Sequence, residues 1–304
     1  MCESRRVVSP SGQAVELRVG AYQAEIVEVG AGLRSLRKEG RDVIAGYAAD
    51  EMCTAGRGQV LLPWPNRIED GSYEFDGKPY QLPLSEAKSR NAIHGLTRWV
   101  NWHLAVRSPG YATWTYRLPA QPGYPFVLDL AVAYGLSENG LRVDISARNL
   151  SGAPAPYGHG AHPFLTVGRR INECELTLPA STRCEADARG IPGPAEPVGG
   201  GPYDFRRPRL VGTTAFDHPF GGLPDNGSAT TVTLRDPSSD HSASLTADPA
   251  YRWLQVFSGD ALPTRAREAL AVEPMTCPPN AFRTGIDLVT LAPGELHTAG
   301  FTIG

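Results

Sequence analysis

Two histidines three residues apart are the strongest candidates for chemistry in this chain. His159 and His162 lie in the stretch Tyr-Gly-His-Gly-Ala-His-Pro-Phe, numbered 157–164. Pro163 disfavours a helical conformation for His162, and the glycines allow the backbone to approach another backbone or a ligand closely. Histidine is the side chain whose ordinary pKa lies nearest neutrality, so it exchanges protons at physiological pH. The stretch therefore predicts a strand or strand end that presents an imidazole for acid–base chemistry.

Other polar side chains stand in similarly rigid surroundings of proline, glycine and aromatic residues. They are Asn66 and Arg67 after Pro-Trp-Pro, His94 before a glycine, Asp217 and His218 between Phe216 and Pro219, and Glu273 before Pro274. An arginine in a constrained loop presents a preformed guanidinium fork to hydroxyl or carboxylate groups, although arginines in turns more often simply face solvent. There is no glycine-rich phosphate loop and no G-x-S-x-G nucleophile motif.

These residue types are compatible with three kinds of chemistry. His94, His162 and Glu273 could hold a metal ion, but they lack the short spacing that makes a metal site recognisable in a sequence, and we expect none. Asp217 and Glu273 could serve as the two carboxyl groups of a glycoside hydrolase, and that alternative stays open. An imidazole that faces a carboxylate is suited to moving protons between two oxygens of one small molecule.

The elements that must position these residues are strands. Apolar and polar residues alternate over residues 13–39, 126–134, 141–147 and 171–179, and residues 71–84 have the pattern of a hairpin with its turn at Asp76-Gly77. Helical periodicity is nearly absent, and residues 189–208 are rich enough in glycine and proline to indicate a surface loop. No composition break divides the chain. We predict a single all-β domain of antiparallel strands over residues 1–304.

Composition narrows the function classes. The chain has 304 residues, 20% of them charged, with a net charge of −3, which argues against a nucleic-acid or anionic-membrane surface. No run of about 18 apolar residues occurs, so no membrane span is expected. The five cysteines show no C-x-x-C pair, which favours small buried thiols over a zinc site or a disulfide framework. The first residues lack the apolar segment of a secretion signal, and a cytoplasmic location is expected.

Five short motifs, in order, give the chain a resemblance to the aldose 1-epimerases, the galactose mutarotase family. They are Pro65-Asn66-Arg67-Ile68, Ile93-His94-Gly95, Ala161-His162-Pro163-Phe164, Phe216-Asp217-His218 and Val272-Glu273-Pro274. Each motif alone is weak, but five at compatible separations are strong. The sequence around Trp64 and after Glu273 is similar to that of the bacterial branch of the family, which includes sulfoquinovose mutarotase-like members. The resemblance extends over roughly residues 13–303.

The resemblance implies a β-supersandwich with a shallow sugar cleft and no cofactor. By motif, His162 would be the general acid that protonates the ring oxygen of a pyranose, and Glu273 the general base at the anomeric hydroxyl. Arg67, His94 and Asp217, together with Asn66 and Trp253, would bind the sugar. Phe164 stands where the family often has tyrosine.

The chemistry of such a pair can be anticipated from the residues. A carboxylate in an apolar pocket has its pKa raised toward neutrality, and an imidazolium that faces it is favoured by the opposite charge. We expect a small-molecule sugar as the partner, and a monomer or homodimer. A binding protein without catalysis, or a scaffold turned to another acid–base reaction on a hemiacetal-like biosynthetic intermediate, are the alternatives.

Overall fold

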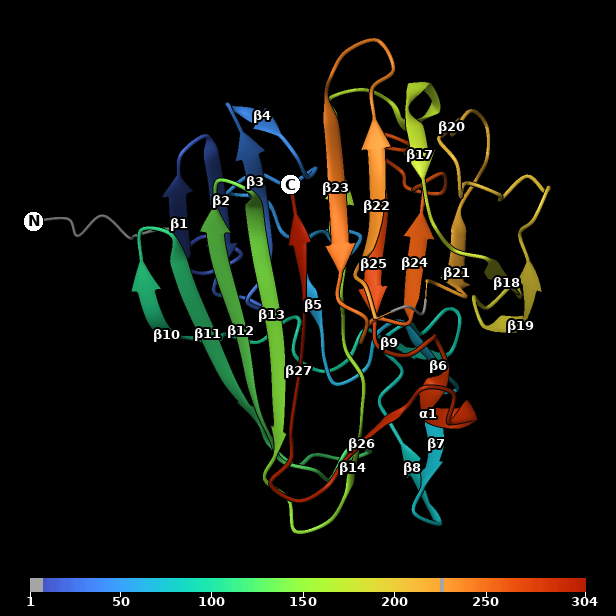
Figure 1. Cartoon of the computed structure of the whole chain (residues 1–304). Coiled ribbons are helices and arrows are strands. Elements are labelled where there is room, and N and C mark those ends of the chain that lie inside the picture. Colours follow the sequence, from blue (N-terminus) through green and yellow to red (C-terminus); the bar gives the residue numbers. More distant parts are fainter. Residues whose placement is uncertain (1–7, 225–226) are drawn as a thin grey trace, which may run out of the picture.

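The computed structural model describes residues 8–224 and 227–304, and β-strands dominate it (Figure 1). Within these residues the helical elements are the short helix α1 (Ala281–Thr284) and the 3-10 turn η1 (Ile171–Glu173). No helix in the described ranges is long and apolar enough to cross a membrane. The prediction of an all-β antiparallel fold is confirmed.

One layer is a nine-stranded sheet in which every neighbouring pair is antiparallel (Figure 1). Its spatial order is β10 (His103–Ser108), β11 (Tyr111–Leu118), β12 (Leu128–Ser137), β13 (Gly140–Asn149), β27 (Leu296–Ile303), β23 (Ser242–Ala247), β22 (Thr230–Arg235), β17 (Glu175–Thr177) and β20 (Arg209–Leu210). Strands β12 and β13 cover most of the strands predicted at residues 126–134 and 141–147, and they form a hairpin because a turn sequence, Ser137-Glu-Asn-Gly140, lies between them.

The second large sheet has eight strands, and it carries most of the motifs. Its order is β19 (Pro192–Pro197), β18 (Thr182–Ala186), β21 (Asp217–Gly221), β24 (Trp253–Phe257), β25 (Leu270–Met275), β15 (Gly160–Ala161) and β5 (Val60–Leu61), with β16 (Phe164–Leu165) also paired to β25. Strand β25 is buried along its whole length, which explains why its sequence is nearly continuous in apolar residues.

Smaller sheets complete the fold. A four-stranded meander comprises β1 (Ala14–Val19), β2 (Tyr22–Val27), β3 (Leu33–Lys38) and β4 (Arg41–Asp42). Three pairs are β14 (Ala155–Tyr157) with β26 (Val289–Leu291), β6 (Arg67–Glu69) with β9 (Asn91–Ile93), and β7 (Ser72–Phe75) with β8 (Lys78–Gln81). The last pair is the hairpin predicted at Asp76-Gly77.

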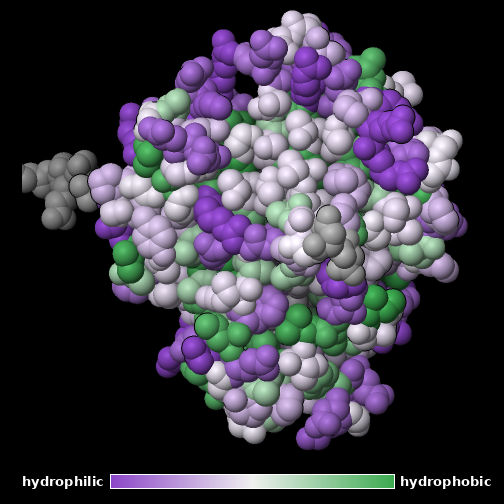
Figure 2. Space-filling model, viewed as in Figure 1, coloured by the Kyte–Doolittle hydropathy of each residue, from purple (hydrophilic) through white to green (hydrophobic). Residues whose placement is uncertain are grey.

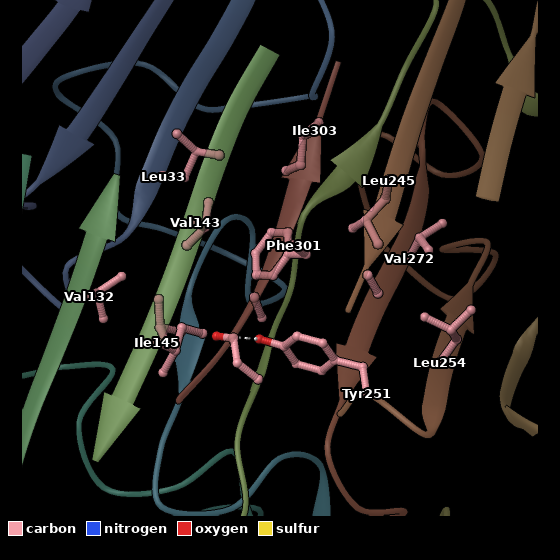
Figure 3. Packing of buried hydrophobic residues seen from close by; sticks show 14 of the residues in the cluster. Leu33, Val132, Val143, Ile145, Leu245, Tyr251, Leu254, Val272, Phe301 and Ile303 are labelled. Atoms are coloured by element: carbon pink, nitrogen blue, oxygen red, sulfur yellow. Dashed lines mark hydrogen bonds between the residues drawn. The ribbon is translucent and has the colours of Figure 1, made fainter. Parts of the chain in front are cut away.

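The core lies between the two large sheets, where Figure 3 shows Val143 and Phe301 of one sheet and Leu254 and Val272 of the other. Successive side chains on a strand point to opposite faces. Since Leu254 and Val272 point into this core, their neighbours Gln255 and Glu273 face the other side of the eight-stranded sheet. That side is where the functional side chains gather. On the side shown in Figure 2, hydrophobic residues are scattered among polar ones, and strongly hydrophilic residues gather along the upper rim.

Two local predictions are wrong in part. Residues 171–179 form the turn η1 before a strand of only three residues, and the expected surface loop at 189–208 contains β19. The second error arises because pairing with β18 makes a strand of a segment whose composition indicates a loop. Cys53, Cys174, Cys184 and Cys277 are buried free thiols, as predicted. Cys2 and the N-terminal segment through residue 7 lie outside the described residues. The single-domain assignment stays a prediction.

Candidate active site

His162 and Glu273 meet on the outer face of the eight-stranded sheet. His162 lies between β15 and β16, both of which pair with β25, and Glu273 is in the middle of β25. The His162 Nε2 atom is 3.3 Å from Glu273 Oε1. Both side chains are almost inaccessible, with 5% and 2% of their surface exposed. A buried imidazole and a buried carboxyl group are therefore already in contact.

The backbone around His162 leaves its ring little freedom. Gly56 has φ +72°, and a Cβ there would lie 2.6 Å from His162 Cδ2. The Phe164 ring stacks on the imidazole at 5.0 Å between centroids and 12° between planes. In this arrangement an aromatic ring at position 164 serves to hold the imidazole.

Three buried polar atoms at the site have no hydrogen-bond partner in the described part of the chain. They are His162 Nδ1, Glu273 Oε2 and Gln255 Oε1. Buried polar groups nearly always have partners in a folded protein, so a cluster of exceptions needs an explanation. A hydroxyl-rich ligand would supply both donors and acceptors here.

Burial governs the protonation of the pair. It raises the pKa of Glu273 well above its ordinary value; the negative charge of Asp217 adds to this rise and Arg67 opposes it. Burial also lowers the pKa of His162 to about 3, and the charges of Arg57 and Arg98 contribute. The predicted rise for the carboxyl is confirmed in direction. The expectation of an imidazolium is not met, because desolvation of the buried ring lowers the His162 pKa and so favours the neutral imidazole.

His94 completes a tight group with this pair. Its candidate ligand atom and those of His162 and Glu273 all lie within 4.8 Å of one another, a composition that could hold a metal ion. The Asn66 backbone N–H donates to His94 Nδ1 at 3.2 Å, and both residues have left-handed backbones, φ +53° and +61°. Burial lowers the His94 pKa well below its usual range, so the ring is neutral. With Nδ1 accepting, the proton sits on Nε2, which suits a hydrogen-bond donor better than a metal ligand.

Arg67 lies on β6, beside the pair, but its fork is already engaged. Its Nε and Nη2 atoms form a bidentate ion pair with Glu86 at 2.9 and 3.0 Å. The positive charge nevertheless lowers the pKa of Glu273, so Arg67 is within electrostatic range of the catalytic candidate. The sequence predicted a clamp for a hydroxyl or carboxylate group, and in the structure the Nε and Nη2 atoms clamp the Glu86 carboxylate, which fixes the orientation of Arg67.

Asp217 and Gln255 extend the polar group along the same sheet face. Gln255 lies directly opposite Glu273 in the β24–β25 register and donates from Nε2 to Asp217 Oδ1 at 2.8 Å. Sequence reasoning missed Gln255, although it is only 3% exposed. One signal was available, since Gln255 is a polar residue in the middle of an otherwise apolar strand, Trp253–Phe257.

Trp253 lies two residues from Gln255 on the same face, and its indole N–H donates to Asp287 Oδ2 at 2.8 Å. The other two histidines that the sequence singles out, His159 and His218, stand apart from the group. His159 is fully buried and hydrogen-bonded to the hydroxyls of Tyr157 and Tyr251 at 2.9 and 3.1 Å. His218 contacts Glu185 at 3.4 Å.

The model of the aldose 1-epimerase family matches residues 13–304 of this sequence. The chain belongs to the aldose 1-epimerase family. YihR of Escherichia coli (strain K12), an uncharacterized protein, is 40% identical over 295 residues, which cover 96% of this chain and 93% of YihR. Human galactose mutarotase is 29% identical over 236 residues, which cover 71% of this chain and 68% of that protein.

Solved structures agree on the fold. An aldose epimerase homologue from C. elegans superposes with a TM-score of 0.85 at 21% identity, covering 96% of this chain and 98% of that one. Galactose 1-epimerase from Lactobacillus acidophilus gives a TM-score of 0.80 at 22% identity, covering 96% and 94%. The fold is therefore galactose mutarotase-like, and family membership supports interconversion of sugar anomers in general.

Proposed function

We propose that this protein interconverts the α and β anomers of an aldose by opening and closing the sugar ring. The observation that carries the proposal is the contact between His162 Nε2 and Glu273 Oε1 inside a group of buried, unpartnered polar atoms. Mutarotation needs one acid and one base that act on neighbouring oxygens and are both restored by the end of the turnover. A pair that shares one proton meets that requirement.

The proton count is simple. When the proton is on His162, the imidazolium donates it to the ring oxygen while the Glu273 carboxylate takes the proton of the anomeric hydroxyl. The bond between C1 and the ring oxygen breaks, an aldehyde forms, and the proton of the pair is now on Glu273. After rotation about C1–C2, the carboxyl group returns its proton to the aldehyde oxygen, and His162 recovers the other as the ring closes. Burial favours the second state, and Arg67 opposes this by favouring the carboxylate.

The polar side chains around the pair would bind the sugar hydroxyls. His94 offers a neutral N–H donor, Asp217 and Gln255 offer acceptor oxygens, and Arg67 offers its remaining N–H groups. Asn66 acts through its backbone by fixing the tautomer of His94, and Trp253 presents an aromatic surface suited to the C–H face of a pyranose. The reaction as written needs no cofactor.

A second observation concerns the charge of the sugar. Arg57 and Arg98 both lower the pKa of His162, and in the described residues carboxylates act on these two arginines only through longer-range electrostatics. The Arg57 Nε atom is buried without a partner. Burying a cation without a counterion is costly, so the buried Arg57 favours an aldose that carries an acidic substituent, and the half-buried Arg98 adds positive charge near the same pair.

The experiment is anomer exchange followed by NMR on freshly dissolved α-glucose, α-galactose and a sulfonated hexose. Faster equilibration with the protein than without it supports the proposal. Equal buffer rates with a folded protein would exclude it for these three sugars and favour the binding or repurposed alternatives. If the charge argument holds, Arg98→Gln lowers kcat/KM for the sulfonated hexose more than for glucose.

A further inference from the structure

The tip of the β18–β19 hairpin, residues 187–191, is a rigid turn. The Asp187 carboxylate accepts hydrogen bonds from the backbone N–H groups of Arg189 and Ile191 at 2.8 and 2.9 Å. The backbone N–H of Gly190 donates to the Asp187 carbonyl at 2.9 Å. A side chain that bonds its own turn in this way holds the loop in one conformation. The tip is thus able to act as a fixed wall.

The Arg189 side chain fastens this tip to a segment far away in the sequence. Its Nη2 is 2.8 Å from Asp70 Oδ1, its Nη1 is 3.3 Å from Glu69 Oε1, and its Nε donates to the Ser89 carbonyl at 3.0 Å. Further contacts reach the Arg90 carbonyl at 3.2 Å and Asn91 Oδ1 at 3.4 Å. Single exposed ion pairs contribute little, but a guanidinium with this many partners orders both segments.

A chain of hydrogen bonds leads from Arg189 to Arg67. The buried amide of Asn91 donates from Nδ2 both to the Arg189 carbonyl at 2.8 Å and to Glu86 Oε2 at 3.0 Å. Glu86 in turn holds the Arg67 fork. Gly190 also packs directly against Arg67. Its φ is +77°, and a Cβ at this position would lie 2.6 Å from Arg67 Nη1. Arg67 is enclosed between Glu86 and the hairpin tip.

We infer that residues 187–191 form a wall of the sugar site, and that Glu86 and Arg189 are positioning residues that aim Arg67 at the substrate. The inference rests on the proposed function, in which Arg67 binds the sugar. Neither residue contacts His162 or Glu273, so neither takes part in proton transfer. Loosening the wall costs binding of the sugar, which raises KM, and leaves kcat nearly unchanged.

The test is steady-state anomer exchange on Arg189→Met, Arg189→Lys and Glu86→Gln. Loss of a charge-assisted hydrogen bond raises KM about tenfold, with kcat within about threefold of the unaltered protein. Lysine keeps the charge of arginine but not its guanidinium fork, so the KM of Arg189→Lys lies between that of the unaltered protein and that of Arg189→Met. Arg117→Met is the matched control, because Arg117 makes an equally bidentate pair with Asp129 on the nine-stranded sheet. Its KM stays unchanged.

Amide hydrogen exchange provides a readout independent of turnover. In Arg189→Met, the amides of residues 187–191 exchange faster, and those of β25 do not. An unaltered KM in a variant whose tip exchanges faster would overturn the inference, and so would an equal fall in kcat and kcat/KM. Failure of the proposed function is a different result, since the unaltered protein would then give no exchange above buffer. If the unaltered protein gives no exchange above buffer, the proposed function and this inference are both wrong.

Discussion

Substitution of Gly56 by alanine tests how closely the position of His162 controls the reaction. The added Cβ would lie 2.6 Å from His162 Cδ2 and 3.1 Å from both Cγ and Nε2. Carbon atoms pack at about 3.5–4.0 Å, so the imidazole must move by about 1 Å. Phe164 stacks on the ring, so it cannot move freely. A displacement of about 1 Å at a reacting group costs about 10²-fold in rate, and we expect that loss in kcat.

The same substitution also strains the backbone, and a control separates the two effects. An L-residue in the left-handed region costs about 1–2 kcal/mol, which corresponds to a fall of about 2–6 °C in Tm for a chain of this size. Gly77 has φ +68° and nothing within 4 Å of its would-be Cβ. Gly77→Ala therefore shares the strain and leaves His162 in place.

Anomer exchange at saturating sugar and thermal melts of both variants provide the assay. We expect similar falls in Tm and a loss of kcat confined to Gly56→Ala. A folded Gly56→Ala protein with unchanged kcat would refute the reasoning, as would an equal loss of kcat in Gly77→Ala.

Three further predictions follow from burial and hydrogen bonding. Because the pair must hold one proton in the proposed mechanism, kcat/KM is constant between the two pKa values. It falls as the pH approaches the His162 pKa of about 3 or rises past the raised pKa of Glu273, as a pH–rate profile would show. Since the folded pKa of Glu273 is raised, its protonated form stabilises the fold below the unfolded pKa, and this stability is lost as the pH rises toward the folded pKa. Melts should therefore show Glu273→Gln gaining Tm relative to the unaltered protein as the pH increases, and a constant difference would contradict this. His159→Leu removes the hydrogen bond of the Tyr157 hydroxyl and leaves the Tyr251 hydroxyl with only a 3.5 Å contact to the Ala299 carbonyl. Chemical denaturation should therefore show a loss of about 1–3 kcal/mol with kcat preserved in the folded fraction; a large loss of kcat would instead give His159 a role in the site.

Local patterns were sufficient for much of the fold. The β7–β8 and β12–β13 hairpins were predictable because alternation and a glycine turn coincide in each. Residues 189–208 were not predictable, because β19 has the sequence Pro-Gly-Pro-Ala-Glu-Pro and exists through its pairing with β18. Such pairing is decided by distant parts of the chain.

The candidate site shows the same division. Motifs identified His162, Glu273, Arg67, His94 and Asp217, and the structure brings these side chains together although Arg67 and His94 lie outside the eight-stranded sheet. Gln255 was missed because its position opposite Glu273 depends on the register of two strands. The ion pair between Arg67 and Glu86 could not be predicted from the sequence either. The two residues are 19 positions apart, and the pairing of β6 with β9 brings their segments together.

The central claim is that His162 and Glu273 move the two protons of mutarotation. Its most direct test is the rate of anomer exchange, measured by NMR, for the unaltered protein, His162→Gln and Glu273→Gln. Each general acid or base contributes about 10²–10⁴ in rate, so each variant should lose at least about 10²-fold while it remains folded. Exchange by either folded variant at the rate of the unaltered protein would contradict the account.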